Sequence, residues 1–185
     1  RFVTERLDEL LSISAAELGL APDAVGSHHF ISRSALRRVL LTGLEAVMRF
    51  ERTFSRYERR PGGRVMAHFA DGSTAEGDVL VGADGYRSEV RRRVLGDGPA
   101  RAVGWTSWQG LTKALPGIAE STYARCLVGP AGLCGLMPAG DGLLQWWFDV
   151  PDEPDGPVVE WLRTRFAGYA EPVRGLLAGV TDADV

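Results

Sequence analysis

The stretch GDVLVGADGYRSEVRRRV, from Gly77 to Val94, decides the fold class of this chain. Its residues 79–81 form a continuous apolar run without alternation, which is typical of a strand buried on both faces of a layered α/β sheet. Asp84-Gly85 ends the run, and a short helix is predicted from Ser88 to Leu95, with Val90 and Val94 facing inward. Strand, Asp-Gly turn and helix together predict a nucleotide-binding element.

The Asp84-Gly85 turn brings a carboxylate to the carboxyl edge of the predicted sheet, where open α/β folds bind ligands. Gly85 has no Cβ to obstruct the turn and permits a positive φ. The N–H groups that begin the next helix favour an anion such as a pyrophosphate. Because a carboxylate repels a pyrophosphate, we expect Asp84 to accept hydrogen bonds from sugar or ribityl hydroxyls. On spacing alone, an Asp-Gly turn that only caps the helix explains these residues equally well.

The N-terminal half contains two further predicted helices and a hairpin. Leucines at mostly helical spacing indicate an amphipathic helix over Thr4 to Leu18, either continuous or broken near Ser12 to Ser14. Ser32 is expected to cap a helix from about Arg33 to Met48, whose apolar stripe comprises Leu36, Leu40, Leu44 and Val47. From the residues alone, Arg33 is best explained as a surface arginine in the first turn. Alternation over Arg64 to Ala70, followed by Asp71-Gly72, predicts a β-hairpin.

The second half changes in character near Pro99. Strand-like segments separated by Gly, Pro and Asp turns predict a mostly antiparallel sheet, formed by Trp105 to Leu111, Thr122 to Val128, Leu133 to Pro138 and Leu143 to Val150. Helices are predicted at Val158 to Tyr169 and Pro172 to Ala178, with a frayed tail TDADV. The predicted fold class is α/β with α+β, namely a partial Rossmann-like layer in residues 1–98 and a helix-covered sheet in residues 99–185.

Composition excludes several kinds of partner and site. The 185 residues are 45% apolar and 24% charged, as in a globular protein. A formal charge of −3 is too small to favour nucleic acid or an anionic membrane as a partner, and neither is predicted. No apolar run is long enough to span a bilayer. We therefore expect a cytoplasmic protein, of undetermined oligomeric state. Cys126 and Cys134 are expected to be free buried thiols, and adjacent His28 and His29 suit a metal poorly, so no metal site is predicted.

The segment VLVGADGYRSEVRR resembles the Asp-Gly motif of the flavoprotein hydroxylases built on the para-hydroxybenzoate hydroxylase fold. In that family the aspartate of the motif contacts FAD and lies near the path by which NADPH approaches. The resemblance therefore implies cofactor-binding roles for Asp84 and Gly85, with Ser88 and Arg91 at the serine and arginine positions of the motif. The preceding hairpin RVMAHFADGSTAEGD is similar to the usual lead-in of the family.

A second segment, ISRSALRRVLLTGL from Ile31 to Leu44, resembles the helix of the same family that begins with an arginine. There the arginine reaches the FAD pyrophosphate, so the resemblance gives that role to Arg33. A guanidinium at a helix N-terminus adds positive charge where the amides already favour phosphate. The GxGxxG segment and the later Gly-Asp motif of the family do not occur in this sequence, and we expect the chain to represent an internal part of such a protein.

The resemblance implies an FAD-dependent monooxygenase that hydroxylates an aromatic or polyketide-like small molecule with NAD(P)H and oxygen. Residues 1–98 would form part of the FAD-binding region and residues 99–185 the substrate-binding layer. Trp105, Trp146 and Trp147 are candidates for the substrate cavity, although each is also explained as a core residue, and adjacent Trp146 and Trp147 must point to opposite faces. No catalytic acid or base is predicted. Another flavin oxidoreductase on this fold, or a non-catalytic relative, stays open as an alternative.

Overall fold

The computed structural model of the chain describes residues 1–14, 17, 31–96, 98–118 and 123–185. Its contacts divide it into two compact units, Arg1–Leu40 with Gly104–Val185, here called the sheet unit, and Leu41–Val103, the small unit. This division differs from the predicted one, because residues before Leu41 group with the C-terminal sheet rather than with the Asp-Gly segment. The functional names given to the two predicted regions stay predictions.

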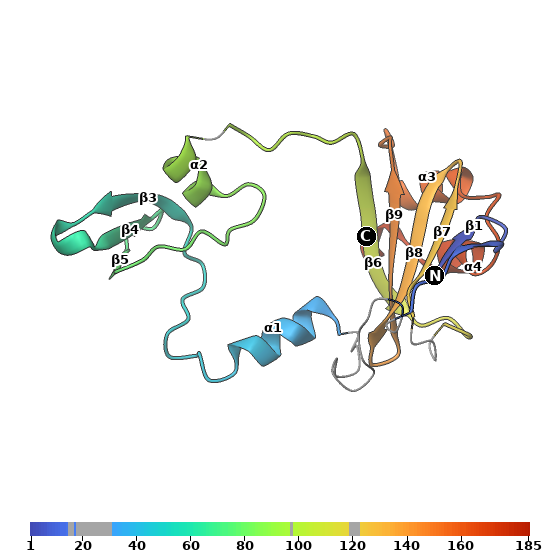
Figure 1. Cartoon of the computed structure of the whole chain (residues 1–185), viewed down its shortest axis with the longest axis horizontal. Coiled ribbons are helices and arrows are strands. Elements are labelled where there is room, and N and C mark those ends of the chain that lie inside the picture. The colour runs from blue at the N-terminus through green and yellow to red at the C-terminus, as the bar shows by residue number, and fades with distance from the viewer. Residues whose placement is uncertain (15–16, 18–30, 97, 119–122) are drawn as a thin grey trace. The chain divides into compact units, whose positions relative to one another are not determined.

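The sheet unit contains a six-stranded sheet of order β2-β1-β7-β8-β9-β6 (Figure 1). The strands are β1 (Phe2–Thr4), β2 (Glu9–Leu11), β6 (Thr106–Lys113), β7 (Arg125–Gly129), β8 (Gly132–Gly140) and β9 (Leu143–Val150). Only the β1–β7 pair is parallel; the other pairs described in this sheet are antiparallel. The mostly antiparallel sheet of the second half is thus confirmed.

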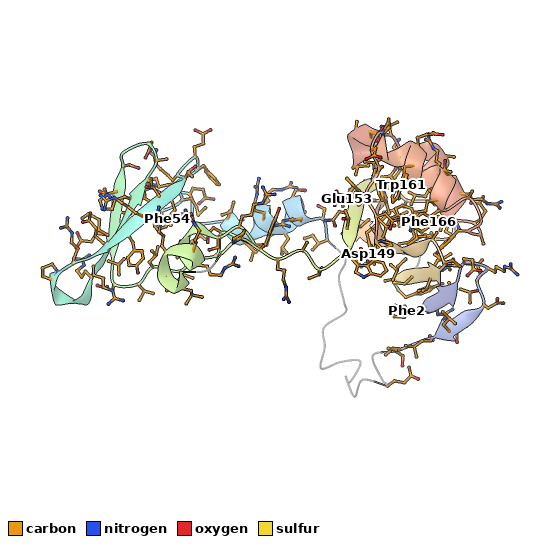
Figure 2. All side chains as sticks on the ribbon, turned by 90° about the horizontal axis from the view of Figure 1, so that it is seen from above. Phe2, Phe54, Asp149, Glu153, Trp161 and Phe166 are labelled. Carbon is orange, nitrogen blue, oxygen red and sulfur yellow. The ribbon has the colours of Figure 1, made fainter. Side chains whose placement is uncertain are left out.

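Two helices, α3 (Val158–Arg165) and α4 (Val173–Gly179), supply the other half of the core of this unit. Side chains of β9 alternate, and Phe148 is one of those that are fully buried. Its ring meets that of Phe166, which is labelled in Figure 2, edge-on at 4.7 Å between centroids. Phe166 in turn meets Tyr169 at 4.8 Å. Such aromatic contacts fix the helical layer against one face of the sheet.

The C-terminal tail is ordered, so the prediction that it frays is wrong. It forms the 3-10 turn η2 (Asp182–Asp184). The backbone N–H and the hydroxyl of Thr181 donate to Oδ2 of Asp184 at 2.8 and 2.9 Å. Asp182 Oδ1 accepts the backbone N–H of Val159 at 2.8 Å, in the first turn of α3. These side-chain hydrogen bonds hold a segment that its composition alone marks as loose.

The predicted helix over Thr4 to Leu18 is also wrong over its described residues, which form β1, a turn and β2. Thr4 Oγ1 accepts the backbone N–H groups of Arg6 and Asp8 at 3.3 and 3.1 Å, and Leu7 has a φ of 77°. The leucines have helical spacing, but the backbone hydrogen bonds between β1 and β7 determine the structure here. Tertiary contacts thus override the local pattern.

The small unit contains an antiparallel sheet of β3 (Phe54–Arg59), β4 (Val65–Phe69) and β5 (Thr74–Gly77), and the helix α2 (Glu89–Leu95). The predicted hairpin is β4–β5, and its partner β3 was not predicted. Helix α2 ends at Leu95, as expected, and the next residue, Gly96, has the left-handed conformation. Val90 is buried as predicted, but Val94 is exposed, which corrects the expectation that both face inward.

Two apolar segments are more exposed than their sequences predict. The run at residues 79–81 forms no strand, and Val79 and Val81 are each 77% exposed, so the buried strand is wrong for the structure described. Among the described residues no strand lies alongside it to pair with its backbone. Helix α1 spans Arg33–Leu41, capped by the Ser32 hydroxyl on the Ala35 N–H at 3.2 Å. It is shorter than expected, and none of its residues is buried.

Candidate functional site

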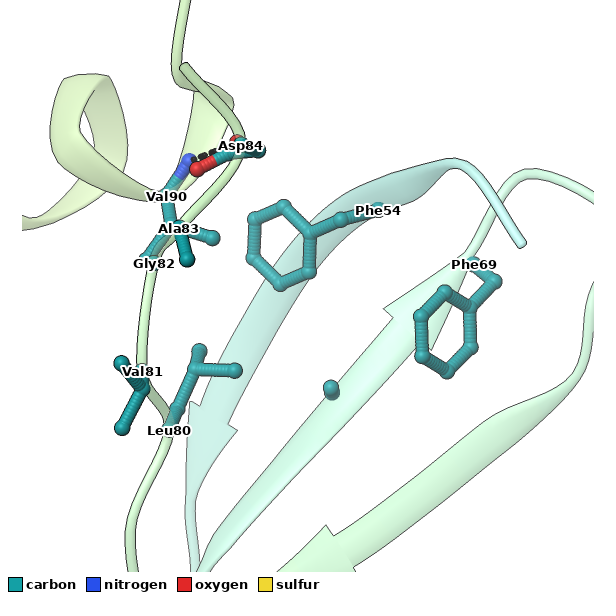
Figure 3. Close-up of a pocket in the computed structure, with 9 residues that line it drawn as sticks. Phe54, Phe69, Leu80, Val81, Gly82, Ala83, Asp84 and Val90 are labelled. Carbon is teal, nitrogen blue, oxygen red and sulfur yellow. Dashed lines mark hydrogen bonds between the residues drawn. The ribbon is translucent and has the colours of Figure 1, made fainter. Parts of the chain in front are cut away.

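The Asp84-Gly85 turn is built around hydrogen bonds from Asp84 to the start of α2. Asp84 Oδ2 accepts the backbone N–H of Glu89 at 2.8 Å. It also accepts the backbone N–H of Val90 at 3.3 Å (Figure 3). Its Oδ1 accepts the hydroxyl of Ser88. The Ser88 oxygen accepts the backbone N–H of Arg91 at 2.9 Å. Two side chains thus satisfy the first amides of the helix.

This arrangement differs from the expectation that the helix amides face a phosphate. The amides of Glu89, Val90 and Arg91 already have protein acceptors. The hydrogen bond from Ser88, followed by those from backbone N–H groups, lowers the pKa of Asp84 below its ordinary value, because each favours the ionised carboxylate. In the structure, Asp84 is therefore a helix cap that remains charged, as the alternative explanation of the motif supposed.

Gly85 has a φ of 80°, so the positive φ that its position permits is confirmed. No atom lies within 4 Å of where its Cβ would stand. The glycine is therefore required by the backbone conformation rather than by crowding, and it leaves open space beside the turn. The Arg91 guanidinium donates to the Tyr86 carbonyl oxygen of the turn at 3.0 Å.

A small apolar hollow of about 240 Å³ lies beside this turn. Its wall includes Phe54 and Phe69 from the sheet of the small unit and Leu80 from the segment before the turn. Figure 3 shows Leu80 pointing toward Phe54, whereas Val81 points away. Asp84 stands at the edge of the hollow with both carboxylate oxygens turned to α2.

In the sheet unit, the two adjacent tryptophans of β9 face opposite sides of the sheet, as predicted. Trp146 is 0% exposed and packs at 5.9 Å from Phe148 in the core, so it lies away from the uncovered face. Trp147 is half-buried on the face that α3 and α4 do not cover. Trp105, just before β6, is 59% exposed. Of the three candidates, the structure leaves Trp105 and Trp147 accessible and assigns Trp146 to the core.

Arg33 lies at a hollow of about 480 Å³ in the sheet unit, together with Gln109, Gln145, Leu111 and Asp184. Its side chain is exposed, and within the described ranges no carboxylate forms an ion pair with it. Gln109 carried no prediction. The signal was present in β6, where alternation with Trp108 puts Gln109 on the same face as Trp147. Asp84 and Gly85 belong to the other unit, so the predicted site residues form two groups, each described within its own unit.

Cys126 and Cys134 are free and buried, as expected, and burial raises the pKa of both thiols. Among the residues that the structure describes, no three His, Cys, Asp or Glu side chains gather as metal ligands, and His28 and His29 lie outside those residues. None of the helices in the described ranges is both long and apolar enough to cross a lipid bilayer.

Comparison with known proteins identifies several relatives by sequence. The FAD-dependent urate hydroxylase of Klebsiella pneumoniae is 35% identical over 158 residues, which are 81% of this chain and 41% of the relative. The 3-amino-4-hydroxybenzoate 2-monooxygenase of Streptomyces cremeus is 31% identical over 160 residues, covering 83% of this chain and 40% of the relative. No family model matches the chain. The chain spans about two fifths of the length of these relatives.

Solved structures of similar fold belong to the same class of enzyme. The K. pneumoniae enzyme HpxO, complexed with FAD and uric acid, matches with a TM-score of 0.71 at 33% identity over 83% of this chain and 41% of that chain. A variant of HpxO complexed with FAD matches with a TM-score of 0.81 at 30% identity over 99% of this chain and 49% of that chain. These matches confirm the predicted fold class. In sequence and fold, the chain is thus similar to part of the FAD-dependent aromatic-ring monooxygenases.

Proposed function

We propose that the protein to which this chain belongs is an FAD-dependent monooxygenase that hydroxylates an aromatic small molecule with NAD(P)H and oxygen. One observation carries the proposal, namely the Asp84-Gly85 turn with its capped helix α2, in a chain that is 33% identical to an enzyme solved with FAD and uric acid. The relatives act on urate and on 3-amino-4-hydroxybenzoate, which are small aromatic molecules. A cytoplasmic location stays a prediction of the sequence.

The residues of this chain fit a flavin dinucleotide at two places. Arg33 offers an exposed guanidinium at the start of α1, with no carboxylate of the described chain to neutralise it, as binding of a phosphate group requires. Gly85 leaves open space on the outer side of its turn, so a ligand can approach the backbone there. We assign cofactor contacts to Arg33, Asp84 and Gly85.

Asp84 contributes mainly by holding the turn in shape. Its oxygens accept hydrogen bonds from Ser88, Glu89 and Val90, so a ribityl hydroxyl would have to share an oxygen that is already engaged. A carboxylate oxygen has two lone pairs, and the Oδ1 atom accepts only the Ser88 hydroxyl within the described residues. Asp84 can therefore cap α2 and still accept one hydroxyl from the cofactor.

The uncovered face of the six-stranded sheet would form one wall of the substrate cavity. Trp147 and Trp105 offer accessible aromatic surface there or at its margin, whereas Trp146 stabilises the layer from the core side. FAD, when bound and reduced by NAD(P)H, supplies the transfer of one oxygen atom from O₂ to an electron-rich ring. The protein residues bind and orient that ring and exclude water from it.

The proposal is tested on the complete protein that contains this chain. Purified from cells, it should be yellow, retain FAD, and consume NADH or NADPH and oxygen in the presence of an aromatic substrate. Arg33→Ala should lower the FAD content on purification, whereas Arg37→Ala, which removes an arginine from the same exposed helix, should not. A colourless protein that takes up no FAD would overturn the proposal, as would equal FAD content in both variants for the role of Arg33.

A further inference from the structure

The uncovered face of the sheet unit carries a compact patch of six residues in two rows across three strands. In the first row, Trp147 of β9 lies between Gly135 of β8 and Gln109 of β6. In the second row, Gln145 lies between Met137 and Leu111. Directly paired residues of antiparallel strands point to the same side of a sheet, so the six positions share one face. We call them the central patch.

The indole ring of Trp147 packs flat against β8 in this patch because Gly135 has no side chain. A Cβ at Gly135 would stand 2.0 Å from two atoms of the Trp147 indole. The ring therefore lies against the backbone of β8, with one side on Gly135. An indole held in this way presents its other side as a surface on which a planar ring can stack.

The two carboxamides of the patch flank this floor at a spacing suited to one ring system. Gln109 is the direct cross-strand neighbour of Trp147, and Gln145 precedes Trp147 by two residues on the same strand. Neighbouring strands lie roughly 4.8 Å apart and alternate residues of one strand roughly 6.8 Å apart. The two carboxamides are therefore diagonal neighbours, about as far apart as the opposite edges of a fused bicyclic ring.

The central patch contains no ionisable side chain. On the same face, Asp149 lies beyond the first row and Lys113 beyond the second, at the ends of their strands. Asp184 lines the hollow that Gln109, Leu111 and Gln145 of the patch also line, but its carboxylate is engaged by Thr181. Arg33 borders the same hollow and is assigned above to the cofactor phosphate. With Arg33 engaged by the cofactor phosphate, a substrate carboxylate over the patch would lose water without gaining a partner, which is costly.

A carboxamide offers a donor and an acceptor side by side. Its natural complement is another group with both, such as the N–H and C=O of an amide or lactam in the ring. We propose that the substrate is an uncharged, planar aromatic ring system with an amide or lactam edge, stacked on Trp147 and hydrogen-bonded by Gln109 and Gln145. This inference rests on the proposed function and specifies the substrate class of that enzyme.

The test uses the complete protein with FAD bound and three matched probes. They are 2-quinolone, which has a lactam edge, quinoline, which lacks it, and quinoline-2-carboxylate, which carries a negative charge. Dissociation constants come from the change in flavin absorbance on titration. We expect 2-quinolone to bind at least fivefold more tightly than quinoline and at least tenfold more tightly than the carboxylate. Equal or tighter binding of the carboxylate would overturn the proposal.

Variants assign the effect to the patch. Gln109→Leu and Gln145→Leu should each weaken 2-quinolone binding about fivefold, the loss of roughly one hydrogen bond, while quinoline binding changes little. Lys113→Gln, on the same face outside the patch, is the matched control and should leave all three constants unchanged. Unchanged 2-quinolone binding in both leucine variants would sink the assignment. FAD content is measured on every sample, so loss of the flavin marks failure of the proposed function, and intact flavin with the wrong probe order marks failure of this inference alone.

Discussion

The carboxylate of Asp84 accepts the backbone N–H of Glu89 at 2.8 Å, so the aspartate of the Asp-Gly turn also satisfies the first amides of α2, whose N-cap residue is Ser88. The Ser88 hydroxyl accepts a hydrogen bond from the backbone N–H of Arg91 and donates one to the Asp84 carboxylate. The segment from Asp84 to Arg91 therefore has a connected set of hydrogen bonds that determines where helix α2 begins. Its consequences can be measured without knowing the substrate.

Loss of either cap should destabilise α2 and the small unit. Ser88→Ala removes a buried hydroxyl that both donates and accepts, and we expect it to lower the free energy of unfolding by about 1 kcal/mol. Asp84→Ala should lower the unfolding midpoint as well, and in the complete protein it should weaken flavin retention. Urea denaturation followed by far-ultraviolet circular dichroism measures the first two effects. Asp78→Ala removes an exposed carboxylate with only a 3.7 Å ion pair and should leave the midpoint unchanged.

The capped state should persist into acid. The hydrogen bonds from Ser88 and the helix amides hold the pKa of Asp84 below its ordinary value of 3.8. A depressed pKa in the folded state means that the stabilisation is fully present above pH 3.8 and is lost as the pH falls through the lower, folded value. The amide signals of Glu89 and Val90 in a nuclear magnetic resonance titration should therefore shift only below pH 3.8. A midpoint at or above that value would contradict the capping role.

Gly135→Ala should displace Trp147. The new Cβ would stand 2.0 Å from the indole atoms, so the ring must rotate off β8 or the strands must separate. We expect a loss of roughly 1–3 kcal/mol in unfolding free energy and a change in near-ultraviolet circular dichroism. Gly156→Ala is the control, because nothing lies within 4 Å of its Cβ position. An unaltered tryptophan spectrum in Gly135→Ala would show that the ring does not rest on this glycine.

Asp182→Ala should destabilise the first turn of α3. The Asp182 carboxylate accepts the N–H of Val159 in the first turn of that helix, which has no capping side chain of its own. Loss of the bond should cost about 1 kcal/mol and raise the hydrogen-exchange rate of the Val159 amide. Asp155→Ala, in the loop before α3, provides the comparison. Equal exchange rates in the two variants would mean that the tail does not support the helix.

Strands with clear alternation and turn residues were predictable from the sequence. The strands β6 to β9 follow segments such as LLQWWFDV, in which buried and accessible residues alternate and turns containing Gly or Asp follow. The Asp-Gly turn and the limits of α2 were predictable for the same reason, because Ser88 and Gly96 are typical helix ends.

Segments whose structure depends on distant partners were not predictable. The leucines near the N-terminus have helical spacing, yet Phe2 pairs with Cys126, a residue that no local pattern can indicate. The run at residues 79–81 is apolar enough for a buried strand, but a strand also needs neighbours, and the described chain supplies none there. The dual use of Asp84 was equally hidden, because spacing cannot distinguish a carboxylate that caps a helix from one that awaits a hydroxyl.

The parallel pairing of β1 with β7 has a consequence for how the chain acquires its structure during synthesis. Phe2 can pair only after Cys126 has been synthesised, whereas every residue of the small unit lies within Leu41–Val103. On a ribosome that releases the chain from its N-terminus, the small unit can thus complete its contacts first. Strand β1 then remains without its partner until β7 has been synthesised. Closing this long loop is entropically costly, so the sheet unit should fold as the slower, later step.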